Sequence, residues 1–167
     1  MRTAAVMACL VTMSGASGLA QEATDSDRFW PQWRGPLGTG VAPHGDPPVE
    51  WSESTNVRWK VEVPGRGSST PVIWGDRLFV LAAVPTGEEV RSRGGLLTRV
   101  RRRFMGGSPA THVQQFRILA IDRRDGHVIW ERVALEELPH EGTHQTGTFA
   151  SPSAVTDGEV VCAFFGS

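Results

Sequence analysis

The sequence predicts an all-β protein built from repeated, four-stranded antiparallel sheets. Short apolar runs are separated by Asp-Gly or Gly-Asp pairs, a strong hairpin signal because glycine accepts the positive φ that the turn needs. Two segment pairs repeat along the chain, as in repeat-built folds. The 19 Gly, 11 Pro and 6 Trp suit a chain with many turns and a few large aromatic side chains, which is typical of all-β proteins.

The first 20 residues predict an export signal. Arg2 precedes the apolar run 4–11, and Gly18-Leu19-Ala20 fits a small-x-small cleavage site. The apolar run is too short and too polar to cross a bilayer as a helix. We therefore expect an exported mature chain that begins at Gln21 in the periplasm or outside the cell. Its net charge of −1 gives no general attraction to nucleic acid or acidic membranes.

Two cysteines occur. Cys9 lies inside the predicted signal; the residues before it loosely resemble a lipidation site, but the apolar run is too short for one. Cys162 lies in an apolar strand pattern, so we expect a buried, inert thiol without an internal disulfide partner.

Residues 21–56 predict an irregular N-terminal arm rich in Trp and Pro. Pro removes backbone donors and Gly interrupts regular structure. Three large aromatic side chains, Trp30, Trp33 and Trp51, are costly to leave in water, so we expect the arm to pack across a hydrophobic surface. A ligand-stacking arm is the alternative.

The repeats begin at residue 57. Residues 57–61 resemble 128–132 at an offset of 71, and residues 69–79 resemble 151–161 at an offset of 82. The unequal offsets indicate insertions, the clearest at 86–114. Removing its roughly 30 residues brings the larger offset near the 40–50 residues of a four-stranded propeller blade.

Blade strands are named A to D from the centre outward. The predicted strands are Val57–Val63 (D), Pro71–Trp74 (A), Arg77–Val84 (B), Phe116–Asp122 (C), His127–Val133 (D), Ser153–Thr156 (A) and Glu159–Phe165 (B). In the predicted C strand, one face would carry Phe116, Ile118 and Ala120, and the other face would carry Leu119 and Ile121. Apolar residues on both faces indicate a sheet packed between two neighbours.

Residues 120–130 read Ala-Ile-Asp-Arg-Arg-Asp-Gly-His-Val-Ile-Trp. Ala120, Asp122, Gly126 and Trp130 match the Ala-x-Asp-x-x-x-Gly-x-x-x-Trp docking motif of pyrroloquinoline-quinone (PQQ)-like β-propellers. Residues 30–36, 56–59 and 149–158 also resemble exported bacterial members of that family. The resemblance implies that Trp130 packs against a neighbouring blade and that Asp122 helps to fix the turn.

The predicted strands amount to one whole blade and two partial ones. A closed propeller needs at least about four blades. We therefore expect residues 57–167 to be an incomplete propeller, and the chain to be the N-terminal part of a longer protein.

The resemblance implies two functions. The first is a non-catalytic binding or scaffold module that holds a protein or small-molecule partner. The alternative is a quinoprotein-type oxidoreductase that uses PQQ and calcium, many of which carry a vicinal cysteine pair that this sequence lacks. We expect no catalytic residue here, and we assign no cofactor-binding residue.

His140-Glu141-Gly142-Thr143-His144 matches the His-Glu-x-x-His pattern of zinc proteases, in which a helix places both histidines on one face. Pro139 precedes the segment and Gly142 lies inside it, and neither suits a helix. We expect an ordinary polar loop rather than zinc catalysis, although weak metal binding or a ligand contact remains open. Asp122, Asp125 and Asp157 occur at turns, where Asp caps backbone amides, and none is interpreted as catalytic.

The insertion carries six arginines and no acid between residues 91 and 104. They are Arg91, Arg93, Arg99, Arg101, Arg102 and Arg103. We expect a solvated loop, with contact to an anionic surface or partner as the alternative. Export argues against nucleic acid.

Overall fold

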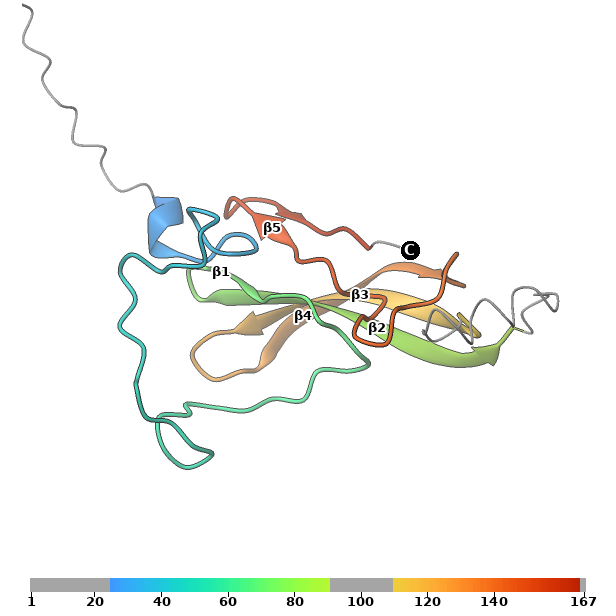
Figure 1. Cartoon of the computed structure of the whole chain (residues 1–167), viewed down its shortest axis with the longest axis horizontal. Helices are drawn as coiled ribbons and strands as arrows, with labels where there is room; N and C mark the ends of the chain where they lie inside the picture. Colours follow the sequence, from blue (N-terminus) through green and yellow to red (C-terminus); the bar gives the residue numbers. More distant parts are fainter. Residues whose placement is uncertain (1–24, 91–109, 166–167) are drawn as a thin grey trace, which may run out of the picture.

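The computed structural model describes residues 25–90 and 110–165, which contain antiparallel strands and no α-helix (Figure 1). The all-β prediction is therefore confirmed. A single 3-10 turn, η1, covers Asp25–Arg28. The strands are β1 (Val72–Trp74), β2 (Arg77–Glu89), β3 (His112–Asp122), β4 (Val128–Glu137), β5 (Val155–Thr156) and β6 (Val161–Cys162). None of the helical structure in these ranges could cross a membrane, and the predicted signal, residues 1–20, lies outside them.

Strands β1 to β4 form one open sheet in the order of the chain. This is the A-to-D order that the sequence predicts. The turn at Gly75-Asp76 joins β1 to β2, and Trp74 pairs with Arg77 beside it. Strands β2 and β3 are longer than expected because their pairing continues to Glu89 and His112. The outer parts of the predicted insertion 86–114 are therefore strand, and its arginines lie outside the described residues.

Strands β5 and β6 form a second, two-stranded sheet. Val155 pairs with Cys162 and Thr156 with Val161. These strands are shorter than predicted. Cys162 is exposed, so the prediction of a buried thiol is wrong. Its neighbours Val161 and Ala163 pack into the core, and because side chains alternate along a strand, Cys162 is directed outward.

Residues 57–63 do not form a hydrogen-bonded strand, which corrects the predicted outer strand there. They nevertheless keep the alternation of a strand: Trp59, Val61 and Val63 are half-buried against a core cluster, whereas Lys60 and Glu62 are exposed. A strand requires a partner for its backbone groups, and the described sheets do not supply one. The segment is therefore an extended cover on one face of the four-stranded sheet.

Strands β2 and β3 are covered on both faces, as the apolar pattern predicts, whereas β4 is mostly exposed, with Val128 and Leu135 at 41% and 44%. Leu119 and Ile121 face the cover formed by residues 59–63. Phe116 and Ala120 are fully buried on the opposite face, where they pack in one cluster with residues 149–165. The sheet thus lies as a middle layer between residues 59–63, which precede it in the sequence, and residues 149–165, which follow it.

The arm only partly fulfils its prediction. Trp30 makes a bridge to Ile73 of β1, so this part of the arm packs against the sheet. Trp33 and Trp51 are 63% and 75% exposed. The prediction that all three tryptophans cover a hydrophobic surface is therefore wrong for these two.

Candidate functional site

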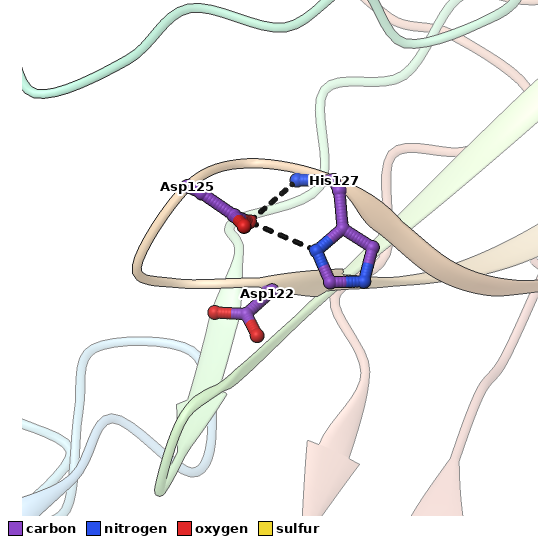
Figure 2. Close-up of side chains that lie close together, drawn as sticks. All are labelled: Asp122, Asp125 and His127. Atoms are coloured by element: carbon purple, nitrogen blue, oxygen red, sulfur yellow. Dashed lines mark hydrogen bonds and ion pairs between the residues drawn. The ribbon is translucent and has the colours of Figure 1, made fainter.

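The loop between β3 and β4 brings Asp122, Asp125 and His127 together (Figure 2). Two backbone hydrogen bonds close the loop: the Gly126 N–H donates to the Asp122 carbonyl at 2.8 Å, and the Asp122 N–H donates to the His127 carbonyl at 2.8 Å. Gly126 has a φ of +82°, a conformation that a residue with a Cβ rarely adopts. The Asp-Gly pair therefore supplies the turn that the sequence predicts.

The Asp122 side chain is 4% exposed and is held by Arg124. Its Oδ1 accepts from the Arg124 backbone N–H at 2.8 Å and from Nε at 3.0 Å, and its Oδ2 accepts from Nη2 at 2.5 Å. The guanidinium and the backbone amide keep the pKa of Asp122 well below its usual range. The same pairing raises the pKa of Arg124.

Asp125 is paired within the same loop. Its Oδ1 accepts from the His127 backbone N–H at 3.0 Å and contacts His127 Nδ1 at 2.9 Å, as Figure 2 shows. The backbone N–H is the larger of the two effects that lower the pKa of Asp125. This is the local Asx geometry by which aspartate fixes a turn.

These three residues could offer a cation ligand atoms within 4.8 Å of one another. The donor set does not fit a metal, because Arg124 already occupies both Asp122 oxygens with a positive charge. A calcium ion needs six to eight oxygen ligands, and it would have to displace that guanidinium. The chemistry of the cluster is therefore turn stabilisation, as the sequence predicts for Asp122 and Asp125.

Two other segments hold the loop from outside. The indole Nε1–H of Trp59 donates to the Arg123 carbonyl at 2.9 Å, and the ring lies against Gly126. The Arg123 N–H donates to the Asp76 carbonyl at 2.9 Å. The β3–β4 loop is thus the point where the cover segment, the β1–β2 turn and the hairpin meet.

The four motif residues occupy distinct places. Ala120, Asp122 and Gly126 are buried, whereas Trp130 is half-buried with its ring centroid 6.0 Å from that of Phe79. Trp130 also packs against the cluster that contains residues 149–165. The tryptophan that meets Gly126 is Trp59, whose segment the repeat relates to that of Trp130.

The His-Glu-x-x-His segment is a loop, as predicted. His140 Nε2 lies 3.9 Å from Glu137 Oε1, and His144 Nδ1 lies 2.9 Å from Thr146 Oγ1. Residues 138–150 contain no helix, so the spacing does not place the two histidines on a helical face. Neither histidine belongs to the metal-compatible group found in the described part of the chain.

Asp157 also acts at a turn. Its Oδ1 accepts from the N–H groups of Val160 at 2.8 Å and Glu159 at 3.0 Å, and these bonds lower its pKa.

The sequence analysis did not identify Arg124 and His127 as the partners of Asp122 and Asp125. An arginine or histidine two residues from an aspartate is common in loops, so the sequence carries no signal that they would pair.

No protein-family model, curated protein or solved structure matches the chain.

Proposed function

We propose that this chain is part of an exported PQQ-like β-propeller that acts as a non-catalytic binding or scaffold module. The observation that carries the proposal is the burial of β2 and β3 on both faces, by residues 59–63 on one side and by residues 149–165 on the other. Propeller blades pack face to face around a ring, and a blade in such a ring is buried in this way.

The second sheet supports the same arrangement. Its inward residues, Val161 and Ala163, pack on the first sheet. Its outward side carries Val155, which is 45% exposed, and the residues that flank β6, Val160 and Phe164, are 56% and 68% exposed. A sheet with two apolar faces is suited to a position between two other sheets.

The described loops favour binding over catalysis. Asp122, Asp125 and Asp157 all use their carboxylates to fix turns, which leaves them poorly placed to transfer protons. Large apolar side chains are exposed on the arm, among them Leu37 at 59% and Trp51 at 75%. Loops carry function in folds with rigid sheets, and these side chains would be available for contact with a partner.

A cofactor titration separates the proposed module from the quinoprotein alternative. The product of the whole reading frame would be purified from the cell envelope and incubated with PQQ and Ca²⁺. We expect neither saturable PQQ binding in a fluorescence titration nor PQQ-dependent dye reduction with alcohols or sugars. Saturable binding together with dye reduction would overturn the non-catalytic proposal.

The ring itself is tested by cryo-electron microscopy of the same product. We expect a closed ring of four-stranded sheets. A stable particle with isolated two-layer sheets and no ring would contradict the propeller.

A further inference from the structure

Part of the arm lies beside β1 of the first sheet and β5 of the second (Figure 1). The Trp30 N–H donates to the Ile73 carbonyl at 3.0 Å, and the Ile73 N–H donates back to the Trp30 carbonyl at 2.7 Å. The next residue reaches the other sheet, because the Pro31 carbonyl accepts from the Thr156 N–H at 2.9 Å. Adjacent residues of the arm thus bond to β1 and to β5.

Aromatic rings seat this segment. The Trp30 ring lies on Gly35, where an added Cβ would come within 2.6 Å of the ring. The Phe29 ring centroid is 5.3 Å from that of Trp74 at the end of β1. The Trp74 indole in turn covers Gly158 in the β5–β6 turn so closely that a Cβ there would overlap it. The ring contacts therefore run from the arm through β1 to the second sheet.

The second sheet has little structure of its own to fix its position. It consists of two residue pairs, and such a short two-stranded ribbon is not stable alone in water. Its place depends on the apolar residues that pack on the first sheet and on the bonds described above. Two further bonds hold the chain that leads into β5: the Ser68 N–H donates to the Ala150 carbonyl at 3.1 Å, and the Thr70 N–H donates to Ser153 Oγ at 2.8 Å. Thr156 is 6% exposed, so losing the acceptor at Pro31 would leave a poorly solvated amide.

We propose that residues 29–35 form a strap that sets the position of the β5–β6 sheet against the four-stranded sheet. Loosening the strap frees the second sheet to move while the first sheet stays folded. Local opening of this kind is expected where few contacts hold a unit. The inference concerns two adjacent described sheets and does not depend on the proposed function.

Amide hydrogen exchange by NMR on the full chain tests the strap. The Gly35→Ala variant puts a Cβ into the Trp30 ring, so the strap should lift. The amides of Ile73 and Thr156 should then exchange roughly fivefold to tenfold faster, the effect of losing about one net hydrogen bond. The Ala83 amide donates to the Arg66 carbonyl at 3.0 Å and makes no bond to the strap. Its exchange rate should be unchanged.

Gly38→Ala is the matched control. Gly38 lies in the same arm with a φ of +65° and has nothing within 4 Å of an added Cβ, so it carries the backbone strain without the ring collision. We expect the exchange of all three amides to be unchanged in this variant.

Two results would overturn the strap. In one, Ile73 exchanges faster and Thr156 does not, which would assign the arm to the first sheet alone. In the other, no amide responds.

Phe29→Leu is the deciding variant if Gly35→Ala accelerates the exchange of all three amides equally, because it removes only the ring contact with Trp74. Faster exchange of Ile73 and Thr156 alone supports the strap, and the absence of that selective effect overturns it.

Discussion

The indole ring of Trp59 lies directly against Gly126. A Cβ at position 126 would be 2.6 Å from Cε3 of Trp59, and the indole Nε1–H donates to the neighbouring Arg123 carbonyl at 2.9 Å. The face of the Trp59 ring and its N–H edge therefore both contact the β3–β4 loop. Through this contact the cover segment is joined to the hairpin that it overlies.

Gly126→Ala is expected to destabilise the protein more than positive φ alone explains. Gly87 has a similar φ of +85° and open space around it, so Gly87→Ala should cost about 1–2 kcal/mol of left-handed strain. Gly126→Ala should cost about 1–3 kcal/mol more because the Trp59 ring must move. Urea unfolding of both variants measures the difference, and equal losses would show that the ring contact contributes nothing.

Trp59→Phe isolates the hydrogen bond to Arg123. The smaller ring can still cover Gly126 but cannot donate, so we expect a loss of about 0.5–1.5 kcal/mol in the free energy of unfolding. Trp51→Phe, at a side chain that is 75% exposed, should change stability by less than about 0.5 kcal/mol. Chemical denaturation of the two variants gives the comparison; a silent Trp59→Phe would refute a role for the indole N–H.

Phe116→Ala tests the face that packs against residues 149–165. Phe116 is fully buried and its ring centroid lies 5.1 Å from that of Phe165, so the truncation should cost about 3–5 kcal/mol. Phe164 is 68% exposed, and Phe164→Ala should stay within about 0.5 kcal/mol of the parent chain. Thermal unfolding followed by circular dichroism measures both, and similar losses would contradict the assigned packing.

The sheet could be predicted from sequence because local signals agree with each other. Turn glycines and alternating apolar residues locate β1 to β4 within a few residues, and the two faces of β3 follow from the period of two. Strand ends could not be predicted. Pairing carries β2 through Pro85, and bulges opposite Phe116 and Ala120 shift the register, which depends on both strands together.

The wrong predictions concern side chains whose burial depends on segments that are far away in the sequence. Cys162 has an apolar neighbourhood in sequence, but only the position of the first sheet decides which side of β6 is buried. Trp33 and Trp51 are hydrophobic, yet no described surface covers them. The contact between Trp59 and Gly126 joins two segments that are far apart in sequence, and a single motif does not say which tryptophan meets which glycine.

Stability should fall in acid because three turn carboxylates have lowered pKa values. Arg124 lowers the pKa of Asp122, and backbone N–H groups lower those of Asp125 and Asp157. Each group stabilises the fold above its unfolded pKa of about 3.9, and that contribution is lost as pH falls through the folded value.

Urea unfolding at intervals between neutral pH and pH 2 measures this dependence. The free energy of unfolding should decline progressively below about pH 4, and Asp122→Asn should flatten the decline because one linked proton is removed. Asp157→Asn serves as a second variant if Asp122→Asn does not fold. A slope that is unchanged in both variants would contradict the assigned pairing.

Metal addition should leave the native protein unchanged. Arg124 engages both oxygens of Asp122, so Ca²⁺ would have to displace a positive charge at close contact. We expect a Tm independent of Ca²⁺ for the parent chain and also for Arg124→Ala, because two aspartates supply too few oxygen ligands for calcium. A Tm that rises with Ca²⁺ in the parent chain would mean that the folded state binds the ion and would contradict this assignment.

Zinc tests the other candidate. Because residues 138–150 form a loop, the purified protein should hold no stoichiometric zinc by elemental analysis, and His140→Ala and His144→Ala should leave the metal content as it was. One zinc per chain that disappears in either variant would mean that the two histidines converge on a metal that the described loop geometry does not provide for.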